Sequence, residues 1–80
     1  MTRDQALAHA SAVLGAIAPE VDLAAIDPTE RLRDEADIDS MDFQRLVAGI
    51  AARTGVEIPE SAYPQVATLD GLLGWLEARG

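Results

Sequence analysis

The sequence contains no cysteine and only one histidine, His9. The absence of cysteine excludes disulfide bonds, thiolate catalysis and a cysteine-rich zinc site. With a single histidine, a catalytic arrangement of serine, histidine and aspartate has little support. We expect His9 to be a solvated surface residue of a helix rather than a catalytic group.

Basic residues are scarce as well. Six Lys and Arg residues stand against 14 Asp and Glu residues, which gives a formal net charge of −8 and a pI near 4.2. Such a surface repels phosphate groups, which argues against nucleic acid and anionic membranes as partners. A protein with a basic surface is the complementary partner.

Long apolar stretches are also absent. The longest, Ala12 to Ala18, is far shorter than the roughly 20 residues that a membrane-spanning helix needs. The N-terminus, Met1 to Asp4, does not lead into a signal-peptide pattern. We therefore expect a soluble, cytoplasmic, monomeric protein without membrane insertion. Its 80 residues suffice for one domain, residues 1–80, with a small core and no separate catalytic cleft, so an ordinary enzyme is not expected.

The first and last predicted helices have clear boundaries. Thr2 and Gln5 form a capping-box pair, and the apolar stripe that follows ends before Pro19. Thr68 is a good N-cap for a helix that continues to the C-terminus. Its apolar stripe consists of Leu69, Leu72, Leu73 and Leu76.

A further helix is predicted from about Ser40 to Arg53, with Gly55 as the left-handed residue that closes it. Its apolar stripe consists of Phe43, Leu46, Val47 and Ile50. Val21 to Ile38 has no sustained period and is expected to be a long loop pinned by Leu23, Ile26 and Leu32.

A short helical turn is predicted from Pro59 to about Tyr63, because Pro64 should end it. No segment alternates with a period of two residues over a useful length. The predicted fold is all-α: a small bundle of three main helices plus one short helix, with a long loop between the first and second helices.

Ser40 lies where the acidic loop gives way to the second long helix. The stretch from Glu20 to Asp42 contains nine acidic residues and only two basic ones, Arg31 and Arg33. A helix start offers free backbone N–H groups and the positive end of the helix dipole. Both favour an attached phosphate, so the sequence displays one hydroxyl at a site suited to that modification.

The order of these landmarks resembles that of the acyl carrier proteins over essentially the whole chain. Asp39-Ser40-Met41 matches the family's Asp-Ser-Leu attachment motif, and Glu57-Ile58-Pro59-Glu60 follows about one helix later. Thr68-Leu69 then falls where the family begins its last helix. Related peptidyl carriers usually have Gly-Gly-His or a similar triplet before the serine, so Asp39 at that position favours the acyl-carrying branch.

The resemblance implies that Ser40 receives 4′-phosphopantetheine from coenzyme A and holds it covalently. The terminal thiol of this arm carries acyl groups as thioesters between enzymes, so the protein is a non-catalytic carrier. A chain without cysteine can still be such a carrier, because the reactive thiol belongs to the prosthetic group. The implied partners are a phosphopantetheinyl transferase and acyl-loading and acyl-transfer enzymes with basic docking surfaces.

The chain departs from the family in two places. Ala36-Asp37 stands where Leu-Gly is common, and the second helix carries Arg45 and Arg53 where acidic residues are usual. We infer a specialised carrier for a dedicated fatty-acyl, lipid or polyketide pathway. The residues expected to meet partners are Asp37, Asp39, Met41, Asp42 and Arg45.

Other interpretations of the same residues remain open. Ser40 can be a plain N-cap, although Asp37 or Asp39 can also fill that role. The chain can also be an unmodified acidic helical module that binds a basic partner, with Ser40 structural or phosphorylated. Met41 is either exposed beside Ser40 or tucked under the loop. A calcium loop is not expected, because no register places glycine and glutamate where such a loop needs them.

Overall fold

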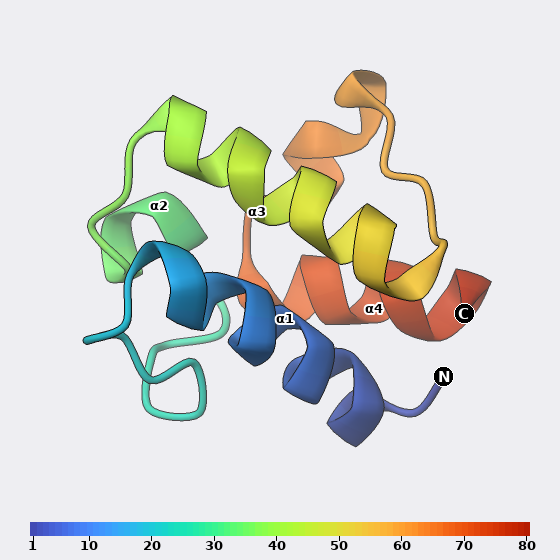
Figure 1. Cartoon of the computed structure of the whole chain (residues 1–80), viewed down its shortest axis with the longest axis horizontal. Coiled ribbons are helices and arrows are strands. Elements are labelled where there is room, and N and C mark those ends of the chain that lie inside the picture. The colour runs from blue at the N-terminus through green and yellow to red at the C-terminus, as the bar shows by residue number, and fades with distance from the viewer.

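Five helical segments account for the regular structure of the chain. The computed structural model describes all 80 residues. It contains α1 (Arg3–Ile17), α2 (Leu32–Glu35), α3 (Ser40–Thr54), the 3₁₀ helix η1 (Glu60–Val66) and α4 (Leu69–Arg79) (Figure 1). The predicted all-α bundle of three main helices and one short helix is confirmed. The single turn α2 is an addition that the sequence pattern did not predict.

The helix ends are fixed by the capping residues that the sequence predicts. At α1, the Thr2 hydroxyl accepts a hydrogen bond from the backbone N–H of Gln5 at 3.1 Å, and the Gln5 side chain accepts one from the Thr2 N–H at 2.9 Å. At α4, the Thr68 hydroxyl accepts a hydrogen bond from the Gly71 N–H at 3.0 Å. Gly55 closes α3 with a φ of 76°, a left-handed conformation that glycine adopts without a steric penalty.

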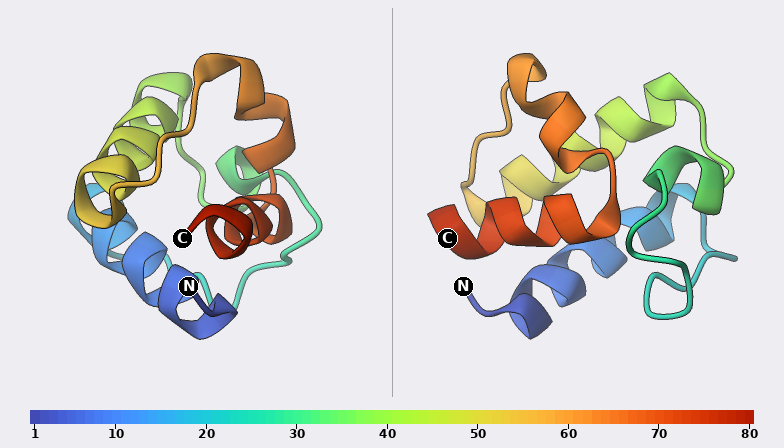
Figure 2. Two further views of the ribbon diagram at one scale, coloured as in Figure 1. Left: turned by 90° about the vertical axis from the view of Figure 1, so that its right-hand side faces the viewer. Right: turned by 180° about the vertical axis from the view of Figure 1, so that it is seen from behind.

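The core is built only from hydrophobic side chains. Twenty residues are buried, and none of them is polar or charged. Helix α1 packs against both α3 and α4, while η1 packs against α4. The two views of Figure 2 show these four elements surrounding a common interior. The largest fully buried side chains are Leu14, Leu23, Leu32, Leu46, Ile50, Val66, Leu72, Leu73 and Leu76.

Two glycines let neighbouring elements approach closely. A Cβ atom at Gly49 of α3 would lie 2.5 Å from Val13 Cγ1 of α1. A Cβ atom at Gly71 of α4 would overlap the backbone oxygen of Gln65 in η1. Gly74, one turn further along α4, has no atom within 4 Å of the same position. Packing therefore explains the helical Gly49 and Gly71, whereas nothing in the structure explains Gly74.

The long segment between α1 and α3 is tied to the start of α4. The predicted anchors Leu23 and Leu32 are buried, and Ile26 is half-buried. The Leu32 N–H donates to the Ala67 carbonyl at 2.7 Å, and the Asp70 N–H donates to the Pro28 carbonyl at 3.0 Å. The prediction of an uninterrupted loop was wrong for residues 32–35, because burial of Leu32 and this bond to Ala67 fix one helical turn there.

The short helix η1 is longer than predicted. Pro59 occupies its N-cap position, and the helix continues through Pro64 to Val66 instead of ending near Tyr63. Proline breaks an α-helix mainly by removing one bond and by clashing with the carbonyl four residues earlier. A short 3₁₀ helix has hydrogen bonds to the third residue instead, so Pro64 is accommodated there.

The two chain termini lie at one end of the bundle, and the start of α3 lies at the other (Figure 1). Helix α1 runs antiparallel to α3 and α4, so the loop after α1, α2 and the first turn of α3 gather at that second end. The longest helices, α1 and α3, have 15 residues each, and neither they nor the others meet the length and hydropathy that a membrane crossing requires.

Candidate functional site

Helix α3 begins at Ser40 because Asp39 caps it. The Asp39 backbone is extended, and its Oδ1 atom accepts a hydrogen bond from the Asp42 N–H at 2.8 Å. Aspartate is among the strongest N-caps, and its negative charge interacts favourably with the helix dipole. Ser40 is therefore the first helical residue. The predicted helix start is confirmed, whereas the interpretation of Ser40 as a plain N-cap is wrong.

The Ser40 hydroxyl is free within the protein. Its side chain is exposed and makes no hydrogen bond. The single histidine cannot serve as its base, because His9 Nδ1 accepts a hydrogen bond from Arg53 Nε at 3.0 Å near the far end of α3. At 1.5 Å per residue, Arg53 lies about 20 Å from Ser40 along the helix. His9 is half-buried on α1 and its hydrogen bond to Arg53 is exposed, so it is a surface residue that is less solvated than predicted.

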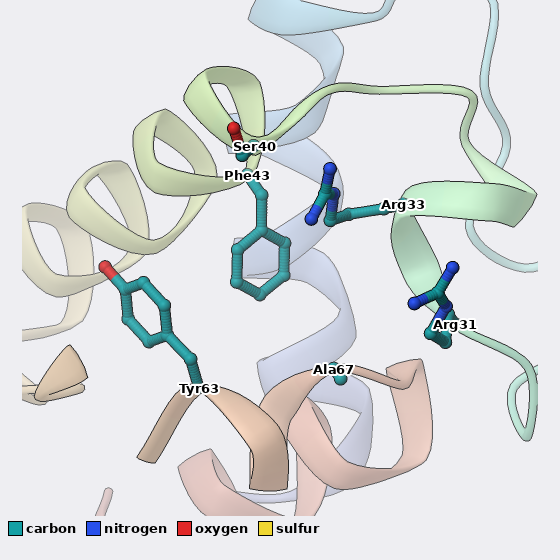
Figure 3. Close-up of a pocket in the computed structure, with 6 residues that line it drawn as sticks. All are labelled: Arg31, Arg33, Ser40, Phe43, Tyr63 and Ala67. Carbon is teal, nitrogen blue, oxygen red and sulfur yellow. The ribbon is translucent and has the colours of Figure 1, made fainter. Parts of the chain in front are cut away.

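A cavity of about 190 Å³ opens beside Ser40. Four segments of the chain contribute to it: the turn α2 with the residue before it, the first turn of α3, η1, and the connection between η1 and α4 (Figure 3). One side is aromatic, because the rings of Phe43 and Tyr63 meet edge to face with centroids 5.5 Å apart. The lining residues are Arg31, Arg33, Ser40, Phe43, Tyr63 and Ala67.

The two arginines of the cavity differ in their electrostatic environment. Arg31 Nε lies 3.0 Å from Asp34 Oδ2, and this hydrogen bond together with the carboxylate charge raises the pKa of Arg31 above its ordinary value. The charge of Arg31 is thus shared with Asp34. Arg33 forms no ion pair, and in Figure 3 its guanidinium group points toward the first turn of α3. The cavity therefore has one uncompensated positive group close to Ser40.

The residues predicted to meet partners surround the start of α3. Asp37 and Asp39 are exposed, and Asp37 adopts a left-handed φ of 52° just before the helix. Met41 is 63% exposed and is the one large hydrophobic residue that is mostly accessible, so the alternative that it tucks under the loop is wrong. Arg45 Nη1 lies 3.5 Å from Asp42 Oδ1, so its positive charge partly compensates the negative charge of that carboxylate. Their function in partner binding stays a prediction.

Sequence reasoning missed the cavity itself. Its lining spans residues from Arg31 to Ala67 and depends on how α2 and η1 pack, which spacing along the chain does not give. One signal was available: Arg31 and Arg33 are the only basic residues between Glu20 and Asp42. Two cations inside so acidic a segment indicate a local use for positive charge.

Comparison with known proteins bears on the same region. No curated protein matches the chain. A family model described as the phosphopantetheine attachment site matches residues 7–76, which include all of α3, η1 and the cavity-lining residues. This match covers most of the chain and agrees with the resemblance in the sequence. The chain belongs to the phosphopantetheine attachment site family, whose domains hold 4′-phosphopantetheine covalently.

Proposed function

We propose that this protein is an acyl carrier whose Ser40 bears the covalent 4′-phosphopantetheine group. The main support is the setting of Ser40, an exposed residue at the start of α3 whose hydroxyl has no partner within the protein. Carrier domains of this family are not catalysts. No side chain is hydrogen-bonded to the Ser40 hydroxyl as a base, which agrees with that, because the hydroxyl then reacts only when a transferase supplies one.

The residues around Ser40 suit the chemistry of the group. Its phosphate is an anion, and the start of α3 offers free N–H groups and the positive end of the helix dipole. A dimethyl-substituted carbon and amide groups follow the phosphate, and the cavity offers the apolar faces of Phe43 and Tyr63. When bound, the group supplies a terminal thiol on which acyl groups are held as thioesters.

In the attachment reaction, Ser40 Oγ forms a bond to the phosphorus that bears pantetheine in coenzyme A. The bond from that phosphorus to the adenine nucleotide breaks, and the nucleotide leaves. The hydroxyl proton passes to a base of the transferase, since Ser40 Oγ is hydrogen-bonded to no side chain of the protein and His9 lies near the far end of α3. Within this protein, α3 and its Asp39 cap hold the hydroxyl in place during the transfer.

The enzymes that load and unload the carrier are expected to approach the end of the bundle where Ser40 lies. Asp37, Asp39 and Asp42 present negative charge there to basic docking surfaces, and Met41 offers an apolar contact. Arg45 changes this pattern, because it lies on the same helix and pairs with Asp42. We infer a specialised carrier for a dedicated fatty-acyl, lipid or polyketide pathway.

The attachment is tested by the intact mass of the purified chain after incubation with coenzyme A and a broad-specificity phosphopantetheinyl transferase. We expect one added phosphopantetheinyl group on the wild type and on Ser11→Ala and Ser61→Ala, which remove the other two serines. We expect none on Ser40→Ala. Modification that persists in Ser40→Ala would falsify the assignment, and an unmodified wild type would favour an acidic module that binds its partner without the arm.

The specialised surface is tested by reversing the charge of Arg45. General fatty-acid synthesis enzymes should accept loaded Arg45→Glu better than the loaded wild type, because the variant presents a more acidic helix to their basic surfaces. Arg53→Glu is the matched control, since Arg53 contacts His9 at the far end of α3. Equal acceptance of the wild type and Arg45→Glu would remove the main support for a dedicated pathway.

A further inference from the structure

Arg33 is the one arginine of the chain without a partner. Of the six, the other five each contact an acceptor or an aromatic ring. The pairs are Arg3 with Asp70, Arg31 with Asp34, Arg45 with Asp42, Arg53 with His9, and Arg79 with the ring of Trp75. A guanidinium group has five N–H donors, and those of Arg33 are all unused within the protein.

This lack of a partner is unexpected in so acidic a segment. Of the carboxylates that neighbour Arg33 in the sequence, Asp34, Glu35 and Asp39 are engaged elsewhere, and those of the exposed Glu30 and Asp37 make no ion pair with it. Asp34 pairs with Arg31, and Glu35 Oε1 accepts a hydrogen bond from the Asp27 N–H at 2.8 Å. Asp39 Oδ1 caps α3 through the Asp42 N–H. The free donors of Arg33 therefore face the cavity rather than an internal carboxylate (Figure 3).

The backbone holds Arg33 in this position. The Ile38 N–H donates a hydrogen bond to the Arg33 carbonyl at 3.0 Å, which links α2 to the residues just before Ser40. Leu32, the preceding residue, is fully buried and bonded to the Ala67 carbonyl. The main chain of Arg33 is thus fixed relative to Ser40, although the two residues belong to different helices.

We propose that Arg33 binds the phosphate of the prosthetic group and so directs the first part of the arm into the cavity. This inference rests on the attachment at Ser40, because Ser40 and Arg33 line the same cavity and the phosphate is bonded to Ser40 Oγ. The planar guanidinium group matches two phosphate oxygens at once, with the helix start as a second source of donors. Arg33 is a positioning residue, and Phe43 and Tyr63 form the wall along which the arm then lies.

Arg31 does not fill this role, although it lines the same cavity. Its guanidinium group is hydrogen-bonded to both carboxylate oxygens of Asp34, at 3.0 and 3.3 Å. Binding a phosphate there would require giving up that pair or sharing it. Arg33 can bind the anion with no such loss.

The test is a cycle of four proteins: the wild type and Arg33→Gln, each with and without the phosphopantetheinyl group. Intact mass first establishes complete modification. Attachment should raise the melting temperature more in the wild type than in Arg33→Gln, by about 1 to 8 °C, the range for one exposed ion pair in a domain of this size. High salt should reduce this difference. The arm carries no acyl group here, so an anionic cargo does not contribute.

Arg45→Gln is the matched control, because it removes the same charge from a residue on the helix that begins with Ser40. We expect attachment to change its melting temperature as in the wild type. The phosphorus chemical shift of the attached group gives a second readout, which should move in Arg33→Gln but not in Arg45→Gln.

The proposal would be overturned if attachment raised the melting temperature equally in Arg33→Gln and the wild type. It would also be overturned if Arg33→Gln and Arg45→Gln lost the same part of this rise, because that result would indicate only a diffuse charge effect. A wild type that never gains the group would overturn the attachment at Ser40 and this inference together, and the mass alone would show it. If the proteins are modified but the rise in melting temperature does not depend on Arg33, the attachment at Ser40 stands and only the role of Arg33 is refuted.

Discussion

Asp39 both caps α3 and contributes a charge next to Ser40, and two substitutions separate these contributions. Asp39→Ala removes the acceptor of the 2.8 Å hydrogen bond from the Asp42 N–H and also removes the charge. Asp39→Asn removes the charge but keeps an oxygen that accepts the same bond, and asparagine is as good an N-cap as aspartate. Any difference in stability between the two variants therefore measures the contribution of the capping hydrogen bond.

The expected sizes follow from this geometry. Loss of a capping hydrogen bond costs about 0.5 to 2 kcal/mol. In a domain of this size each kcal/mol lowers the melting temperature by about 4 to 8 °C, so Asp39→Ala should melt several degrees below the wild type. Asp39→Asn should melt close to the wild type, because the lost attraction to the helix dipole is offset by weaker repulsion from the nearby Asp37 and Asp42.

Thermal unfolding and the rate of phosphopantetheine attachment are measured on both variants. If the transferase needs only an ordered Ser40, Asp39→Asn should be modified at the wild-type rate and Asp39→Ala more slowly. If the transferase also binds the Asp39 charge, Asp39→Asn should keep its stability and lose rate. An Asp39→Asn variant that melts as low as Asp39→Ala would refute the argument, since the charge and not the hydrogen bond would then stabilise α3.

Three further predictions concern stability. Gly74→Ala should raise the melting temperature, since alanine favours a helix by about 1 kcal/mol over glycine, whereas Gly71→Ala should lower it by forcing a Cβ against the Gln65 backbone oxygen; equal effects would contradict the packing. Added salt should raise the melting temperature, because only four of the 14 acidic residues form ion pairs; a flat or falling curve would mean that those pairs outweigh the net repulsion. Hydrogen bonds from the side chain and then the backbone of Thr29 lower the pKa of Asp27, so its stabilising effect is complete above the ordinary value of 3.8 and disappears as the pH falls through the lowered value. Thr29→Ala should therefore destabilise the protein at neutral pH and progressively less below 3.8, and a penalty that does not change with pH would exclude this linkage.

The long helices could be predicted because their signals are local. Thr2, Thr68 and Gly55 are capping residues next to apolar stripes, and the structure uses all three in those positions. Cap chemistry and helical periodicity each act within about one or two turns, so a single sequence contains the information. The start of α3 was predicted for the same reason. Spacing alone could not choose between Asp39 and Ser40 as the cap, because both residue types cap helices well.

The elements that sequence reasoning missed depend on contacts between distant segments. Helix α2 has only four residues, too few to show a period, and the bond from the Leu32 N–H to Ala67 helps to fix it. Helix η1 passes through Pro64, where local preference predicts an end. The cavity beside Ser40 requires both elements in place, so an error in either one conceals it.

At the Ser40 end of the bundle, the acidic side chains and Arg33 lie on different sides of the cavity wall. Asp37 and Asp39 are exposed and do not line the cavity, while Arg33 is also exposed but lines the cavity, with its guanidinium group pointing toward the first turn of α3. If the arm's phosphate binds on the inner side and partners bind on the outer side, changes to the two sides should have separable effects. Neutralising the exposed acids should weaken enzyme binding and leave the arm's position unchanged, because they do not line the cavity. Neutralising Arg33 should release the arm and leave the docking surface intact. The net charge of this acidic segment does not predict these separate effects, because in a net charge Arg33 only offsets part of the negative charge.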